Sequence, residues 1–181
     1  MQQQVEILGA HLYAFRDGSA FTVPEAGTAS RTSKPGPTDP AWIDQGIVDV
    51  IVQPQQEELE VWAPSPGVKQ LEDVIPNKRQ LNLQIKKTEL DNMTLELLWG
   101  AEELPNSPTA GGQFNPMEMG ANGSKWWLKL QYYGRAGTNL ITVDLYCFVK
   151  YDGDFAPGEA AVETQLLART LRSTLNTGTL A

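Results

Sequence analysis

The chain has a single cysteine, Cys147, and a single histidine, His11, among its 181 residues. No internal disulfide can form, and a zinc cluster of cysteines and histidines cannot be assembled. His11 has no Ser or Cys arrangement near it that would make a nucleophile and base pair. The acid pairs at 57–58, 72–73 and 102–103 are adjacent residues that we expect to be solvated rather than catalytic. The sequence therefore predicts no metal, no cofactor and no enzyme activity, with a carboxylate-based hydrolase as the remaining enzymatic alternative.

Basic residues are also few, with 14 Lys and Arg against 22 Asp and Glu and a formal net charge of -8. A protein that grips DNA through its phosphates needs clustered Lys and Arg, and no such run is present. The charge is compatible with a surface past which DNA slides, because like charges repel. From the charge alone, an acidic surface that only keeps a protein in solution is the favoured interpretation.

Long hydrophobic runs are missing as well. No apolar stretch approaches the ~20 residues that a bilayer-spanning helix needs. The start of the chain has neither the basic region nor the apolar core of a signal peptide. We therefore expect a protein that does not enter membranes and is made in a reducing cytoplasm.

Glycine and proline are abundant, with 16 and 12 residues, and they cluster at particular places. Such clusters are typical of turns between short strands. Residues 18–40 are dominated by Gly, Pro, Ser, Thr and Ala without a sustained period, so residues 1–40 are predicted to be an N-terminal arm. The arm is expected to be flexible or to lie against a partner. Residues 41–181 are predicted to form one β domain.

Alternating apolar and polar residues predict antiparallel strands at 43–52, 59–63 and 80–87. The segment between the last two, at about 64–77, contains three prolines and is long for a hairpin loop. Long ordered loops usually have a function of their own. A role in contacts between subunits is therefore a hypothesis for this loop.

A helix is predicted over about 89–99, because Leu90, Met93, Leu97 and Leu98 recur at helical spacing. Thr88 or Asp91 can cap its first turn, and Gly100 suits the left-handed residue that ends a helix. We expect this helix to close one end of the domain.

The strongest strand patterns lie at 125–133 and 140–151, joined by a hairpin over 134–139. The second strand would be about 40 Å long, at ~3.4 Å per residue, which is more than a small sandwich needs. Cys147 lies on its apolar face and is expected to be a core residue. Residues 159–175 fit a helix or a strand. A strand is favoured, because the preceding sheet edge needs a partner.

The aromatic pairs 126–127 and 132–133 raise the possibility of a carbohydrate platform. Alternation along a strand turns one ring of each pair inward, so core or subunit packing is favoured. A carbohydrate-binding β-sandwich module that uses Trp62, Trp126 or Tyr133 remains an alternative function.

Three segments carry a family resemblance: DPAWIDQGIV at 39–48, VWAPSPG at 61–67, and TELD at 88–91 followed by LELLWG at 95–100. With the two long strands and the C-terminal residues, they resemble the major tail tube proteins of long-tailed, siphovirus-like bacteriophages and of related phage-like tails. The resemblance covers about residues 39–180.

This resemblance implies a mainly β fold, an antiparallel β-sandwich with one flanking α-helix, extended loops and an N-terminal arm. It implies a structural virion protein whose hexameric rings stack into a tail tube for genome ejection. Double-stranded DNA would pass through without specific binding. Tail-tip, tape-measure and terminator proteins are the implied partners. Another tail component, such as a terminator or a tail-tip ring, is the alternative within the same class.

The expected assembly surfaces follow from the same resemblance. The 64–77 loop would contact an adjacent ring, and strands within 125–151 would form the inner sheet. The arm would make lateral or axial contacts. The residues assigned to interfaces on this basis are Trp62, Pro64, Pro66, Glu72, Asp73, Tyr133, Tyr146 and Phe148.

Overall fold

The structure is a computed structural model, and it describes residues 7–22, 27–64, 67–101, 114–120, 122–158 and 163–180. Within these ranges the chain forms strands and one short helix, and every strand pairing is antiparallel. The mainly β class with a single flanking helix is confirmed. The elements are β1 (Ile7–Arg16), β2 (Ile43–Trp62), β3 (Leu71–Lys87), α1 (Asn92–Trp99), β4 (Lys125–Gly134), β5 (Asn139–Tyr151), β6 (Thr164–Thr170) and β7 (Thr177–Leu180).

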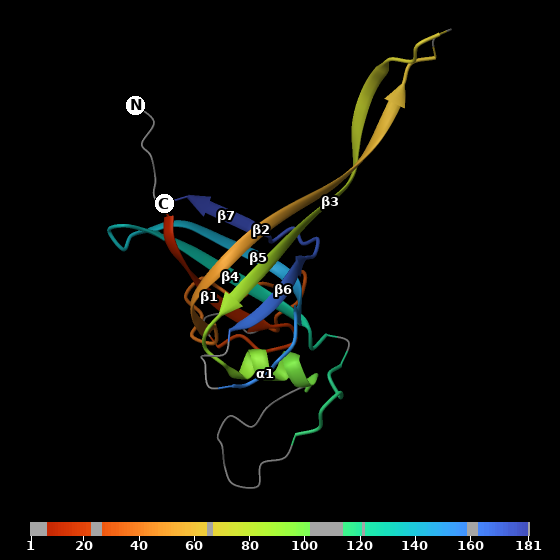
Figure 1. Ribbon diagram of the computed structural model, residues 1–181. Helices are drawn as coiled ribbons and strands as arrows, with labels where there is room; N and C mark the ends of the chain where they lie inside the picture. Colours follow the sequence, from red (N-terminus) through yellow and green to blue (C-terminus); the bar gives the residue numbers. More distant parts are fainter. Residues whose placement is uncertain are drawn as a thin grey trace.

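The sheet closes on itself (Figure 1). Its strand order is β4-β1-β2-β3-β6-β5-β7, and β4 also pairs with β5, so that the pairings form a ring. β5 pairs with β6 over residues 147–151 and with β7 over residues 141–144. β7 thus continues the edge of β5 beyond the point where β6 ends. We call this arrangement the closed sheet.

One face of every strand in the ring points into a common core. Directly paired residues share a face, and Ala10 lies opposite both Val48 and Tyr132. The same inner face continues around the ring through Leu83, Ile85, Leu128, Leu145, Cys147, Val149, Leu166 and Ala168, all of them buried. Each large side chain buried here contributes roughly 1.5–3 kcal/mol before entropy is subtracted.

The helix α1 covers one end of this core. Asp91 caps it by accepting a hydrogen bond from the Thr94 amide at 2.8 Å, and Gly100 ends it at φ 62°. Asp91 itself is extended, so the helix begins three residues later than its pattern predicted. Met93 and Leu97 pack into the core cluster, which confirms that the helix closes one end of the domain.

The prediction of an N-terminal arm over residues 1–40 is wrong for the described part of this range. Residues 7–16 are strand β1, which pairs with β2 on one side and with β4 on the other. Residues 17–22 and 27–42 then cross the outer face of β4 and β5, and we call them the strap. The strap covers aromatic side chains that alternation turns outward, among them Trp127 and Tyr146. Burying those rings offsets the entropy of ordering a segment that has no periodic pattern.

The predicted loop at 64–77 is corrected too, because β2 and β3 are far longer than their patterns indicated. They contain 20 and 17 residues and pair up to Trp62 and Leu71, so the connection spans only residues 63–70. The register shifts beside Glu58, which lies opposite Pro76. A bulge is one of the places in a ladder where a proline is tolerated. Residues 53–58, the run QPQQEE, have no apolar alternation, so the sequence alone divided one strand into two.

The short segment β6 settles the ambiguity at 159–175. Residues 164–170 form a strand between β3 and β5, as the preferred reading predicted. Residues 125–134 and 139–151 form β4 and β5 with a tight hairpin between them, which confirms that prediction as well.

Candidate assembly surfaces

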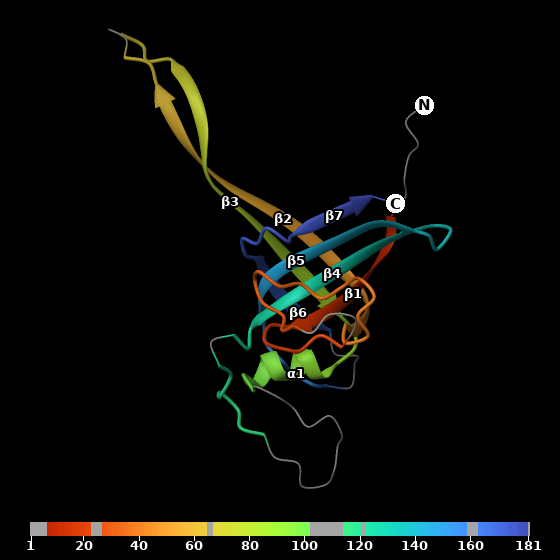
Figure 2. The ribbon, with the colours of Figure 1, turned by 180° about the vertical axis from the view of Figure 1, so that it is seen from behind.

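The distal part of the β2–β3 hairpin leaves the closed sheet (Figures 1 and 2). Pairing of β2 with β1 ends at Val48, and pairing of β3 with β6 ends at Asn82. Beyond these points the two strands pair only with each other among the described residues. We call residues 55–64 and 67–80 the outer hairpin. A two-stranded ribbon is marginally stable in water, and its free edges are ready to pair with another chain.

Large apolar side chains of the outer hairpin are exposed to solvent. Trp62 is 49% exposed, Leu59 58% and Val68 84%. Leu71, Val74 and Ile75 are exposed beside them. Apolar surface gains about 25 cal/mol per Å² when it leaves water. Because the single chain leaves this area uncovered, the outer hairpin has the properties of a docking element.

Each face of the outer hairpin combines carboxylates with apolar side chains. Alternation along β2 places Glu58, Glu60 and Trp62 on one face, which we call the acidic face. Leu59, opposite Ile75, lies on the other face. The acidic face also carries Val74, opposite Glu60, and Leu71, opposite Trp62, whereas Asp73 lies opposite Val61 on the other face.

The outer hairpin carries five acids, at positions 57, 58, 60, 72 and 73, against three basic residues, Lys69, Lys78 and Arg79. Lys78 forms an ion pair with Glu57 at 2.7 Å, and both side chains are more than half exposed. Exposed pairs of this kind contribute ~0–1 kcal/mol. Among the described residues no ion pair engages Glu58 or Glu60.

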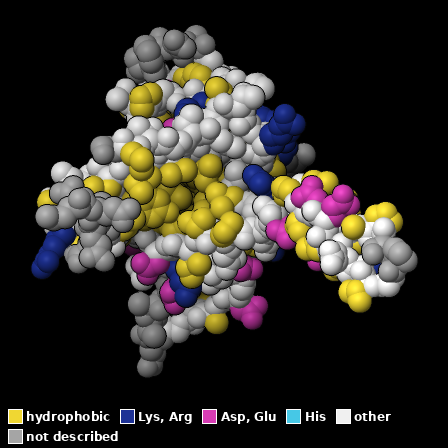
Figure 3. Space-filling model, turned by 90° about the horizontal axis from the view of Figure 1, so that it is seen from above, with side chains coloured by type: hydrophobic (Ala, Val, Ile, Leu, Met, Phe, Trp, Pro, Cys, Tyr) yellow, Lys and Arg dark blue, Asp and Glu magenta, His cyan; other side chains and the backbone are white. Residues whose placement is uncertain are grey.

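A second exposed apolar surface lies at the end of the closed sheet away from α1. The inner face of the sheet extends beyond the buried core. There it carries Val52, which is 45% exposed, and Leu180, which is 79% exposed. Half-buried side chains connect them, including Val50, Leu81, Tyr132, Ile141 and Val143. Figure 3 shows hydrophobic side chains gathered on this face, next to the root of the outer hairpin. We call it the open end.

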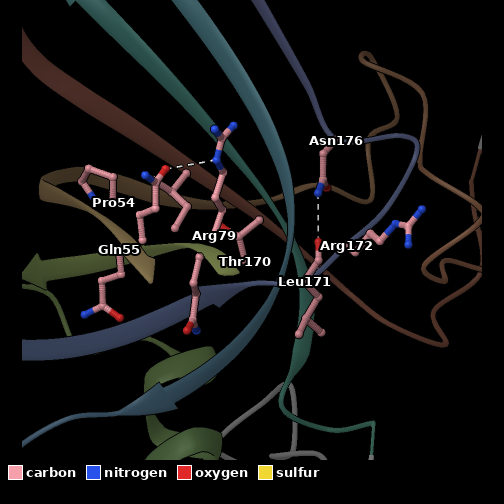
Figure 4. Close-up of a pocket in the computed structure, with 10 residues that line it drawn as sticks. Pro54, Gln55, Arg79, Thr170, Leu171, Arg172 and Asn176 are labelled. Carbon is pink, nitrogen blue, oxygen red and sulfur yellow. Dashed lines mark hydrogen bonds between the residues drawn. The ribbon is translucent and has the colours of Figure 1, made fainter. Parts of the chain in front are cut away.

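A groove of about 670 Å³ lies where the outer hairpin leaves the closed sheet (Figure 4). Arg79 donates from Nε to Gln56 Oε1 at 3.1 Å, and Asn176 donates from Nδ2 to the Leu171 carbonyl at 2.9 Å. No acidic residue lies among its described lining, which consists of Pro54, Gln55, Gln56, Arg79, Gln80, Leu81, Thr170, Leu171, Arg172 and Asn176.

The strap shields the part of β4 and β5 that was expected to face a tube channel. Lys129 of β4 lies opposite Asp144 of β5, and its Nζ donates to the Pro37 carbonyl at 2.9 Å and lies 4.2 Å from the Trp42 ring centre. Burial lowers the pKa of Lys129, although Asp144 opposes this shift. Lys34 adds an ion pair to Asp144 at 2.9 Å. A charge pair covered in this way is not free to line a channel.

The structure brings together only some of the residues that the sequence assigned to interfaces. Trp62, Pro64, Glu72 and Asp73 are exposed together on the outer hairpin. Pro66 lies outside the described residues. Tyr133 is half-buried on β4, and Phe148 is 36% exposed on β5.

The assignment of Tyr146 to an interface is wrong. Its side chain is 2% exposed and packs under the strap, and its hydroxyl donates to Asp17. It cannot contact a neighbour without displacing the strap. Trp126 is likewise 1% exposed, so it is not available to a sugar. Sequence reasoning missed Arg79, Arg172 and the open end.

The described residues offer few groups for metal binding or catalysis. Within the described ranges no group of three or more His, Cys, Asp or Glu side chains is placed to hold a metal ion. His11 contacts Asp44 and stacks on Tyr13, with ring centres 4.7 Å apart. Among the described residues, no helix has the length and apolar character to span a bilayer.

Cys147 is a buried core residue, as its strand position predicted. Burial raises the pKa of its thiol to about 12, so almost none of it is thiolate near pH 8. We expect a thiol reagent such as DTNB to label the folded protein at least ~100-fold more slowly than the protein in urea. Rapid, complete labelling of the folded protein would show that this strand is accessible.

Comparisons with known proteins do not identify a family for the chain. No protein-family model and no curated protein matches the chain. Among solved structures, it is similar to the tube-terminating cap of the anti-feeding prophage, determined by cryo-electron microscopy. The TM-score is 0.46 at 13% identity, covering 100% of this chain and 95% of that chain. A likeness of this size does not establish a shared fold or function.

Proposed function

We propose that the chain is a non-enzymatic structural subunit that assembles with copies of itself into a phage-like tail tube. The observation that carries the proposal is the outer hairpin, whose apolar side chains are exposed and whose strand edges pair with no other described strand. The sequence resemblance to tail tube proteins supplies the kind of assembly. In it, hexameric rings stack into a conduit for genome ejection.

Under this proposal the outer hairpin of one copy docks on a different surface of the next copy, so the contact is heterologous. An outer hairpin on one subunit that docks on a different surface of the next generates a ring when the rotation closes. When the rotation does not close, the same contact generates a helical filament. The open end offers a second apolar surface for stacking one ring on another. Both kinds of contact are required of a tube.

The acidic balance is consistent with a conduit. A strongly basic wall would bind duplex DNA through its phosphates and slow its passage, whereas the net charge here is -8. Under this proposal the protein resides in the tail of a virion or phage-like particle. Its further partners are tail-tip, tape-measure and terminator proteins.

Negative-stain electron microscopy of the purified protein over a range of concentrations tests the proposal. Long tubes with a central channel are the expected result. Isolated rings would instead favour a terminator or a tail-tip ring. Monomers that persist at the highest concentration, or sugar binding by such monomers, would contradict the proposal.

A further inference from the structure

We infer that the acidic face of the outer hairpin of one copy binds in the arginine-lined groove at the hairpin root of the next copy. This inference rests on the proposed self-assembly and names the two surfaces that meet. It concerns Glu58, Glu60 and Trp62 on one copy, and Arg79 and Arg172 on the other.

The lining of the groove includes two arginines and several apolar side chains. Arg79 and Arg172 are exposed and have no carboxylate partner among the described residues. Leu81 and Leu171 are partly buried in the same lining. A guanidinium binds a carboxylate through two parallel hydrogen bonds, which fixes both position and orientation. The groove therefore fits a ligand that carries carboxylates beside an apolar group.

The acidic face of the outer hairpin has that composition. Glu58, Glu60 and Trp62 alternate along β2, so their side chains follow one another at about 7 Å. Among the described residues, the Glu58 carboxylate accepts from the neutral amide of Gln56, at 2.7 Å, and from no cationic group. Trp62 supplies a large, half-exposed ring at the end of the series. An extended strand presents these three groups with little remaining freedom, which lowers the entropy lost on binding.

The occupant must come from another copy. β2 is one continuous strand to Trp62, and its distal part leads away from the closed sheet (Figures 1 and 2). Trp62 lies six residues beyond Gln56, which is roughly 20 Å along an extended strand. Glu58 lies beside its own groove, because Gln56 donates to Glu58 and accepts from Arg79. Glu60 and Trp62 lie farther along β2 and cannot turn back to that groove without breaking the β2–β3 pairing. A neighbouring hairpin meets no such obstacle.

Reversal of the charges on each surface tests the contact. The variants are E58R/E60R on the outer hairpin and R79E/R172E in the groove, and each is followed by sedimentation velocity. We expect the concentration needed for assembly to rise at least ~10-fold in each variant, because like charges then face each other. D154R reverses an exposed acid outside both surfaces and is the matched control, which should assemble like the wild type. Circular dichroism checks that every variant is folded.

A chain that carries all four reversals restores opposite charges across the contact, and we expect it to assemble again. An equimolar mixture of the two double variants should assemble as well. If the wild type forms tubes and the double variants do so equally, the inference is wrong and the proposed function stands. Failure of the four-fold variant to recover, with its fold intact, would also overturn the inference. A wild type that never assembles overturns both.

Discussion

Replacement of residues 57–78 by an Asn-Gly turn is expected to abolish self-assembly and to leave the closed sheet folded. Gln56 and Arg79 are paired neighbours across the hairpin, so a two-residue turn can join them in register. The deleted residues pair only with one another among the described strands, and the core cluster contains none of them. Sedimentation velocity and electron microscopy would therefore report a monomer at every concentration.

The control for this deletion is thermal unfolding of the shortened chain. A midpoint close to that of the full chain shows that the closed sheet does not depend on the outer hairpin. Rings or tubes formed by the shortened, folded chain would show that the outer hairpin is dispensable for assembly, and would remove the observation on which the proposed function stands.

Substitution of Trp127 by alanine is expected to lower the free energy of unfolding by ~3–5 kcal/mol. Trp127 is fully buried between β4 and the strap, and its ring centre lies 5.2 Å from that of Tyr146. Its indole N–H donates to the Ser30 carbonyl at 2.9 Å, so the substitution also leaves this acceptor without its donor. Urea denaturation measures the loss, which is a large fraction of the ~5–15 kcal/mol that stabilises a typical domain.

Trp62→Ala is the matched control, because it removes the same side chain from an exposed position. It is expected to change the free energy of unfolding by less than about 1 kcal/mol and to weaken assembly. Equal stability losses in the two variants would mean that the strap does not bury Trp127 or that the outer hairpin packs against the domain.

Much of the fold follows from short-range patterns. Period-two alternation identified β4 and β5, where apolar residues face the core and every second residue faces outward. The helix was recognisable from its spacing, its Asp91 cap and its Gly100 stop. Such signals are local, so they are present in the sequence before any tertiary contact forms. They also gave the correct assignment of Cys147 to the core.

The assembly surfaces were harder to predict because they depend on pairing between distant residues. Residues 64–77 look like a loop in sequence although residues 71–77 belong to β3, since the strand character of this part comes from cross-strand hydrogen bonds and not from apolar alternation. Arg79 and Arg172 belong to different strands and segments, and only the closed sheet brings them to one groove. Tyr146 was assigned to an interface from the family resemblance, but the strap covers it.

The central claim is that the outer hairpin contacts a second copy of the chain, and photo-crosslinking from position 62 tests it most directly. A photoreactive phenylalanine in place of Trp62 lies on the acidic face and leaves the core intact. The account predicts covalent dimers and higher multimers on irradiation, with crosslinked peptides that join position 62 to residues 79–81 or 170–176 of another copy. Irradiated protein that remains monomeric at the highest concentration, with no intermolecular peptide from position 62, would contradict it.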